Sequence, residues 1–226
     1  MTEMVCSGWR GLLRLVRGDI SWSHALLRSW MTICRLGRRR EYGKLYFQNV
    51  YEAQDPWDYE TSPYEQRKYR TLLNDLSAGS YKKALEVGCS IGVFTRLLAS
   101  RVEALDGIDI SSRAVIAARR RCRDLKHVRL FVSDFFSHPG KAIYDLVLCS
   151  EILYFFWEPR WLRQSAREAA IRLLAKGGTL VVVWGGFRLV QDWDSCLSES
   201  GKLRLRRTRL VNDPVRPYRI SIFERL

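Results

Sequence analysis

The sequence ALEVGCSIGVF, residues 84–94, decides the fold of this chain. A short β-rich run over residues 83–87 leads into a turn that carries Gly88 and Gly92, and a helical pattern follows over residues 92–100. A glycine-rich turn between a strand and a helix lets the backbone approach a nucleotide ligand closely. The stretch therefore predicts the first strand-turn-helix unit of an α/β domain with a ligand at that turn.

The spacing of the turn excludes one class of nucleotide. A nicotinamide dinucleotide is typically bound by a G-x-G-x-x-G turn. Here Ser90 and Val93 stand where that pattern needs its second and third glycines. A dinucleotide is therefore disfavoured, and a different nucleotide-containing ligand is favoured.

Strand and helix patterns alternate through the rest of the chain. Expected strands are 83–87, 102–110, 128–132, 144–149 and 179–184, with helices over 92–100, 112–124 and 160–175, the last ending at Gly177-Gly178. Apolar strands separated by helices indicate a parallel sheet covered on both faces. Residues 203–211 and 219–224 flank a turn and predict an antiparallel terminal pair. The expected fold is a doubly wound, mainly parallel seven-stranded α/β sheet with an antiparallel C-terminal pair.

The N-terminal region differs from this core and gives three expected parts. Residues 1–45 are a basic helical extension, residues 46–80 are lid or cap helices, and residues 81–226 are the ligand-binding domain. Within the extension, apolar residues and tryptophans recur at helical spacing beside arginines. Such helices suit the surface of an anionic membrane. Packing on the core or on another subunit is the alternative.

Charge and cysteine content bound the classes of function. The formal net charge of +14 is compatible with nucleic acid, with an anionic membrane surface, or with a basic solvated exterior. No apolar run is long enough to span a membrane, and arginines interrupt the apolar N-terminal stretch that a secretory signal would need. The six cysteines show no metal-binding spacing, so we expect no metal and a reducing, cytoplasmic location, with possible peripheral contact at the inner membrane.

Polar side chains close the predicted strands at the edge where ligands bind in open α/β sheets. Asp109 ends the second strand, about 20 residues after the glycine turn, where a carboxylate can accept both hydroxyls of a ribose. Ser133-Asp134 ends the third strand, where an acid can accept a proton from an adenine amino group. Ser150 and Glu151 end the fourth strand.

These motifs resemble a class I S-adenosylmethionine-dependent methyltransferase. The resemblance lies in Glu86–Gly92, Asp109, Ser133-Asp134 and Asp145–Tyr154. Upstream, Asp55-Pro56-Trp57, Ser62-Pro63-Tyr64-Glu65 and Lys68-Tyr69 are similar to the nodulation protein S (NodS) family of N-methyltransferases. The resemblance covers about residues 46–186. The family methylates the free amine of a deacetylated glucosamine unit on a chitooligosaccharide, upstream of nodulation-factor acylation.

The resemblance implies roles for individual residues toward S-adenosylmethionine, which leaves as S-adenosylhomocysteine. Glu86 would bind the amino group of its methionine part, Gly88 and Gly92 would allow close backbone approach, Asp109 would hold the ribose, Ile110 would pack on the adenine, and Asp134 would bind its amino group. Trp57 and Tyr64 would form a lid over the donor, and Lys68 would pair with the carboxylate of its methionine part. The other expected donor-binding residues are Cys89, Ser133 and Ser150. For Trp57 and Tyr64, ordinary packing is the alternative.

Glu151 and Tyr154 are the catalytic candidates. A methyl group on a sulfonium is already activated, so the protein chiefly aligns the reacting atoms. An amine acceptor must become neutral, which a nearby carboxylate or tyrosine assists. The alternative for Glu151 is a helix cap or a contact to the donor. The aromatic residues 155–157 and Trp161 are either an acceptor subsite or core packing.

Three functions stay open on sequence grounds. The first is N-methylation of an amino sugar or of an oligosaccharide that carries one. The second is methylation of RNA or of another small molecule, with the basic surface binding phosphates; the motifs typical of base-modifying enzymes are missing. The third is a non-enzymatic module that binds the methyl donor or a membrane surface. The oligomeric state is open as well.

Overall fold

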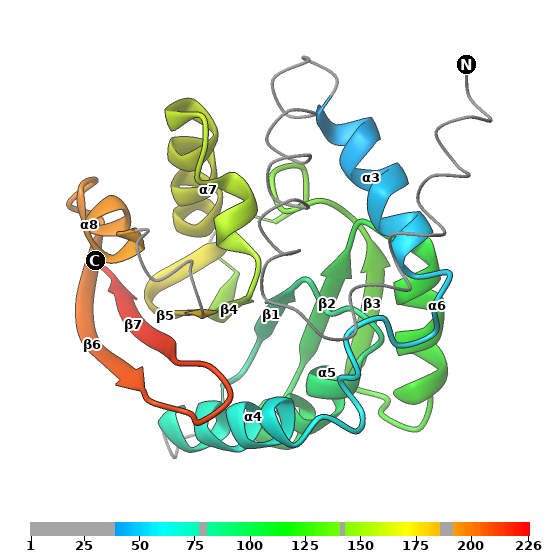
Figure 1. Ribbon diagram of the computed structural model, residues 1–226. Coiled ribbons are helices and arrows are strands. Elements are labelled where there is room, and N and C mark those ends of the chain that lie inside the picture. Colours follow the sequence, from blue (N-terminus) through cyan, green and yellow to red (C-terminus); the bar gives the residue numbers. More distant parts are fainter. Residues whose placement is uncertain (1–38, 77–80, 141–142, 186–191) are drawn as a thin grey trace. The chain divides into compact units, whose positions relative to one another are not determined.

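The computed structural model describes residues 39–76, 81–140, 143–185 and 192–226 (Figure 1). The chain divides into two compact units, Met1–Gly43 and Lys44–Leu226. Residues 1–38, which hold the predicted amphipathic helices, lie outside the described residues. The architecture below is that of the second unit.

A seven-stranded sheet forms the centre of this unit. Its strands are β1 (Ala84–Val87), β2 (Leu105–Asp109), β3 (Val128–Val132), β4 (Tyr144–Ser150), β5 (Leu174–Gly185), β6 (Leu203–Val211) and β7 (Tyr218–Arg225). Their order is β3-β2-β1-β4-β5-β7-β6. The first five strands pair in parallel, and β7 is antiparallel to both β5 and β6. The predicted fold class is confirmed.

The helices begin where local chemistry favours a helix start. They are α3 (Arg39–Val50), α4 (Pro63–Asp75), α5 (Val93–Leu98), α6 (Ser112–Arg121), α7 (Arg160–Leu173) and α8 (Trp193–Ser198), with 3-10 turns η1 (Ala99–Arg101) and η2 (Leu153–Phe156). The hydroxyl of Ser62 caps α4, which has Pro63 in its first turn, and the hydroxyl of Ser111 caps α6. Helix α3 crosses residue 45, the predicted boundary of the extension, and α8 was not predicted.

Helices cover both faces of the sheet, as Figure 1 shows. On one face, α7 and α8 bury Val147 and Cys149 of β4 together with apolar residues of β5. On the other face, α4 and α5 bury Leu146 and Leu148 of the same strand. Consecutive β4 side chains therefore enter opposite layers, which requires the nearly continuous apolar sequence that predicted a parallel sheet.

The predicted end of the helix over 160–175 is wrong. Helix α7 ends at Leu173, and β5 begins at Leu174, so Gly177 and Gly178 lie inside a strand. Pairing with β4 shifts there: Tyr144 pairs with Leu174, but Leu146 pairs with Thr179. Gly177, with φ of +75°, lies in this irregular part of the strand. Its positive φ therefore serves a shift of strand register, and a helix C-cap makes the same conformational demand.

The sheet order places a topological switch point at the carboxyl ends of β1, β2 and β4. Strand β1 is flanked by β2 on one side and by β4 on the other, so the chain crosses over in opposite directions from it. Ligands of doubly wound folds bind at such a switch point. In the described ranges, no helix is long and apolar enough to cross a membrane.

Candidate functional site

The loop after β1 turns on residues with positive φ. Gly88, Ser90 and Gly92 have φ of +79°, +50° and +80°. The amides of Gly88 and Cys89 donate to the carbonyl of Ile108 at 2.8 and 2.9 Å, which fixes the loop against β2. A Cβ on Gly88 would lie 3.1 Å from Ile152 Cδ1. At Gly88 and Gly92 the loop backbone therefore carries no side chain, at the carboxyl end of β1.

Gly92 has a packing role that the sequence did not indicate. A Cβ at this position would lie 2.9 Å from the Cα and the Cβ of Ala118 on α6. The absent side chain therefore lets the start of α5 contact α6. Cys89 belongs to the same region: it is buried in a cluster with Val115 and Ala118, and burial raises the pKa of its thiol well above the usual value. Both residues pack on the side of the loop that faces α6.

Asp109 braces the loop from the end of β2. Its carboxylate accepts hydrogen bonds from the amides of Ser90 at 3.1 Å and Ser111 at 2.9 Å. Burial raises the pKa of Asp109 to about 6, and these backbone bonds oppose the shift. The Tyr51 hydroxyl donates to Ser90 Oγ at 2.7 Å. Asp109 is thus a carboxylate held in place beside the glycine loop after β1. Ile110 follows it as a half-buried apolar residue.

Glu86 is a buried carboxyl with unused hydrogen-bonding capacity. The residue is 4% exposed, and its Oε2 makes no hydrogen bond within the described part of the chain. Burial raises the pKa of Glu86 to about 7, with the Thr95 hydroxyl opposing this and Asp109 adding to it. A buried polar atom without a partner is costly. A cationic ligand beside the carboxyl end of β1 would satisfy it.

The carboxylate of Asp134 is engaged by its own turn. Its Oδ1 accepts from the amides of Phe136 and Ser137, both at 2.9 Å, and its Oδ2 accepts from the Ser137 hydroxyl. Ser133, whose hydroxyl donates to the Asp134 carbonyl at 3.2 Å, lies directly after β3.

Trp57 and Tyr64 differ in their surroundings. Trp57 is 39% exposed, and its ring lies 5.4 Å from that of Tyr51 and 5.7 Å from that of Tyr59. Tyr64 is buried in the layer between α4 and the sheet, with its ring edge-on to Tyr218. Trp57 is therefore open to a ligand, whereas Tyr64 is part of the packing.

Lys68 is buried between two carboxylates. Its Nζ lies 2.8 Å from Glu65 Oε2 and 3.4 Å from Glu151 Oε1. Burial lowers the pKa of Lys68, but Glu151 and Glu65 outweigh it and the net shift is upward. Both partners are protein carboxylates, so Lys68 is engaged by Glu65 and Glu151 in this structure, and its contact with the carboxylate of a ligand stays a prediction.

Glu151 stands at the carboxyl end of β4 in a left-handed conformation, with φ of +56°. Its amide donates to the Val183 carbonyl at 2.8 Å, and Ser150 before it pairs with the same residue. Its Oε2 is buried without a hydrogen bond among the described residues. Tyr154 follows in η2, with its ring 4.5 Å from that of Phe155. The structure thus brings both catalytic candidates to one strand end.

The sequence of this unit matches one family model. The model for nodulation protein S (NodS) matches residues 41–216. That range includes the whole glycine loop, Asp109, Asp134 and the Lys68–Glu151 ion pair.

This chain belongs to the nodulation protein S family.

Named members of the family cover part of the chain. Nodulation protein S of Rhizobium tropici is 35% identical over 130 residues, which are 57% of this chain and 54% of that protein. The protein of Sinorhizobium fredii (strain NBRC 101917 / NGR234) is 32% identical over 130 residues, 57% of this chain and 60% of the relative. The chain therefore spans less than two thirds of the length of these curated relatives.

A solved nodulation protein S structure has the same fold. The N-methyltransferase NodS of Bradyrhizobium japonicum WM9, in complex with S-adenosyl-L-homocysteine, superposes with a TM-score of 0.68 at 24% identity. The match covers 76% of this chain and 92% of that one. It shows that the seven-stranded architecture is that of the family.

Sequence reasoning missed two charged residues of this nodulation protein S site. Glu65 lies three residues before Lys68, a spacing that places side chains together on a helix, so this pair was open to prediction. Arg216 lies in the loop between β6 and β7, with its Nη2 3.3 Å from Glu65 Oε1. The two are 151 residues apart in sequence, and no local pattern indicates such a contact.

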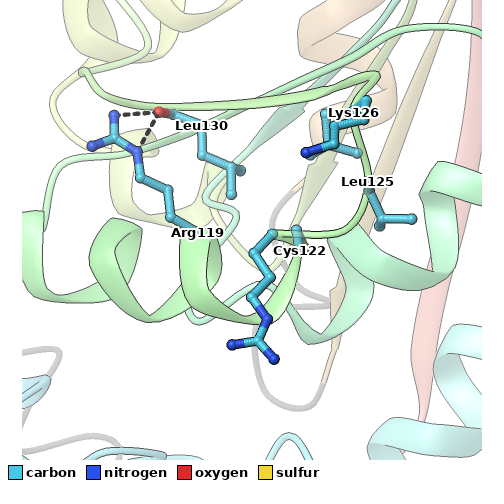
Figure 2. A pocket seen from close by; sticks show the side chains of 7 residues that line it. Arg119, Cys122, Leu125, Lys126 and Leu130 are labelled. Atoms are coloured by element: carbon cyan, nitrogen blue, oxygen red, sulfur yellow. Dashed lines mark hydrogen bonds between the residues drawn. The ribbon is translucent and has the colours of Figure 1, made fainter.

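A separate pocket of about 280 Å³ lies away from this edge. Figure 2 shows Arg119 donating to the Leu130 carbonyl beside Cys122, Leu125 and Lys126. These residues belong to the end of α6, the following loop and β3, where β3 begins. The pocket is therefore at the amino end of β3, opposite to the edge that carries Asp109 and Glu151.

Proposed function

We propose that this chain is an S-adenosylmethionine-dependent methyltransferase that N-methylates the free amine of a deacetylated amino sugar or chitooligosaccharide. The family assignment and one observation support the donor: Glu86 Oε2 is buried without a hydrogen-bond partner in the described residues, at the carboxyl end of β1. The ammonium of an amino acid moiety would satisfy that oxygen. The residues present therefore fit the donor.

The proposed donor site uses the carboxyl ends of three neighbouring strands. Glu86 binds the ammonium of the methionine part, Asp109 binds the ribose hydroxyls, and Ser133 with Asp134 binds the adenine amino group, against which Ile110 packs. Gly88, Cys89, Gly92 and Ser150 shape the backbone around it, and residues 46–80 with Trp57, Tyr64 and Lys68 cap it. Bound there, the donor supplies a methyl group already activated by its sulfonium.

The protein's own contribution is alignment and proton handling. In-line transfer needs the acceptor nitrogen, the methyl carbon and the sulfur on one axis, which a rigid site provides. Glu151 and Tyr154 lie together after β4, at the carboxyl edge of the sheet where we place the acceptor. In this proposal their polar groups hold the amine and help it lose a proton before transfer.

The substrate class rests on the family to which the chain belongs. Relatives carry the name nodulation protein S, and an oligosaccharide acceptor would suit the aromatic residues 155–157 and Trp161 that follow Glu151, since aromatic faces pack on sugar rings. We include in the proposal a cytoplasmic location, with residues 1–45 contacting an anionic membrane surface.

Calorimetric titration of the full chain tests the donor site. S-adenosylmethionine and S-adenosylhomocysteine should bind with micromolar affinity, and Asp109→Ala should abolish this binding. Asp124→Ala is the matched control, because Asp124 is exposed and pairs only with Arg96 in the described structure. Methyl transfer to a chitosan tetrasaccharide, with the fully N-acetylated tetrasaccharide as control, then tests the acceptor. Failure of the folded protein to bind either donor form contradicts the proposal.

A further inference from the structure

Four charged side chains form a group beside the proposed acceptor position. Glu65, Lys68 and Glu151 expose 5%, 2% and 14% of their side chains, and the ammonium lies within 3.4 Å of both carboxylates. Arg216 completes the group from the loop between β6 and β7, with its guanidinium 3.3 Å from Glu65 Oε1. Two carboxylates and two cations make the group formally neutral, so neither carboxylate is an unpaired buried charge.

Arg216 contacts the group from its exposed side. The guanidinium lies 4.6 Å from the centre of the Tyr64 ring, and 44% of the side chain is exposed, so water screens part of its charge. Burial lowers the pKa of Arg216, but the charges of Glu151 and, to a smaller extent, Glu65 raise it above its usual value. Lys68 makes the direct ion pair with Glu151, at 3.4 Å from its Oε1.

Glu151 also has a free oxygen to offer. Its Oε1 takes the Lys68 interaction, and its Oε2 is buried with no hydrogen bond in the described ranges. The charged and titratable groups that face Glu151 are Lys68 and Tyr64 from α4, with Glu65 behind Lys68, and Arg216 from the β6–β7 loop. A buried carboxylate oxygen without a hydrogen-bond partner is complementary to an ammonium group.

We propose that Glu151 binds the acceptor amine in its protonated form, and that Lys68 and Glu65 are positioning residues that hold its carboxylate at the carboxyl end of β4. This inference rests on the proposed methyltransferase function and specifies the substrate of that site as a primary ammonium. The same oxygen could instead face the sulfonium of the donor, which is also a cation. The experiment below separates these two sources of positive charge.

The proton balance of the step follows from this placement. Glu151 Oε2 takes one proton from the ammonium, which leaves a neutral amine with a free lone pair. That lone pair forms the new N–C bond while the C–S bond breaks and its electron pair stays on sulfur. The methylated nitrogen leaves as a secondary ammonium, and Glu151 returns its proton to water.

The first arm of the experiment measures donor binding. Glu151→Gln in the full chain should bind S-adenosylmethionine and S-adenosylhomocysteine within twofold of the wild type, because the amide keeps the shape of the site. The matched control is Glu158→Gln, whose carboxylate is 52% exposed and 3.9 Å from Arg163. A selective tenfold loss for S-adenosylmethionine would assign Glu151 to the sulfonium and overturn the inference. Wild-type protein that binds neither donor form contradicts the proposed function instead.

The second arm measures the amine. The wild-type complex with S-adenosylhomocysteine should prefer a chitosan tetrasaccharide over its fully N-acetylated counterpart by about tenfold, which corresponds to one charge-assisted hydrogen bond. Glu151→Gln should lose this preference, and Glu158→Gln should keep it. Wild-type protein that binds S-adenosylhomocysteine but shows no preference for the amine overturns the inference.

The third arm tests positioning by Lys68. In Lys68→Gln the preference for the amine should be lost, because no ammonium then holds the Glu151 carboxylate in place, while S-adenosylhomocysteine should still bind within twofold of the wild type. Lys68→Arg should restore the preference. A purely structural role would weaken S-adenosylhomocysteine binding and the amine preference together, and that result would contradict the assignment of Lys68.

Discussion

Lys68 and Glu151 form an ion pair across 83 residues of sequence, with Nζ and Oε1 3.4 Å apart. Lys68 lies on α4, before the first strand, and Glu151 follows β4 in the centre of the sheet. The pair therefore ties the segment that precedes the doubly wound core to the strand end that carries the proposed acceptor contact. This ion pair should affect both the stability of the fold and the proposed binding of the acceptor, and the two effects can be measured separately.

Lys68→Met should lower the free energy of unfolding by about 3–5 kcal/mol, the usual cost of leaving buried charges without their partner. The side chain is 2% exposed and both its partners are largely buried, so water cannot replace the ammonium. Urea denaturation measures the change. Arg70→Met, on the exposed side of the same helix, should change stability by no more than about 0.5 kcal/mol. Equal effects of the two substitutions would contradict a buried ion pair.

Gly92→Ala should destabilise the fold more than Gly177→Ala. Both glycines have positive φ, +80° and +75°, and a Cβ in that conformation costs about 1–2 kcal/mol. At Gly92 the new methyl would also lie 2.9 Å from backbone and side chain of Ala118, whereas at Gly177 nothing lies within 4 Å. Overpacking adds about 1–3 kcal/mol. Comparing the thermal denaturation of the two variants isolates the cost of the contact with Ala118. Equal losses of stability would show that α6 can move to accommodate the new methyl group.

The pH dependence of stability should reveal Glu86. Burial raises its folded-state pKa from 4.5 to about 7, so the protonated form is favoured by folding. The resulting stability is fully present below pH 4.5 and is lost as the pH rises through about 7. Without a ligand, the wild type should therefore lose roughly 3 kcal/mol of its free energy of unfolding relative to Glu86→Gln as the pH rises through this window. Glu158→Gln should follow the wild type, and parallel curves for all three proteins would refute the buried, unsatisfied carboxyl.

Much of this architecture was predictable because its signals are local. The apolar strands, the loop glycines Gly88 and Gly92, and an acid at the end of β2 follow from the two periodicities and from backbone geometry. The family assignment, made on Glu86–Gly92 and the Ser62–Glu65 segment, is confirmed by the family match over residues 41–216. The residue roles toward the donor and acceptor remain predictions.

The features that escaped prediction depend on contacts distant in sequence. Gly177 was interpreted as a helix cap, since caps and bulges both require positive φ, and only pairing with β4 distinguishes them. Helix α8 has only six residues, too short for periodicity to reveal. The interaction of Arg216 with Glu65 and the engagement of Lys68 by Glu151 depend on how α4 and the β6–β7 loop meet at one edge. Such contacts follow from tertiary packing alone.

Donor binding should release protons to an extent that depends on pH. In the ligand-free protein at pH 6, Glu86 with a pKa of about 7 is mostly protonated. Binding of an ammonium requires its ionised form, so the wild type should release roughly one proton per donor bound. At pH 8 Glu86 is already mostly ionised, so binding should release far fewer protons.

Calorimetry in buffers of different ionisation enthalpy measures this exchange for S-adenosylhomocysteine, which carries the same amino group. Glu86→Gln should lose most of the release at pH 6, because the remaining contribution comes only from Asp109, whose pKa burial raises to about 6. Glu158→Gln should match the wild type at both pH values. Release that is unchanged in Glu86→Gln would show that the ammonium is bound elsewhere, and the unsatisfied Oε2 would then need another partner at the carboxyl end of β1.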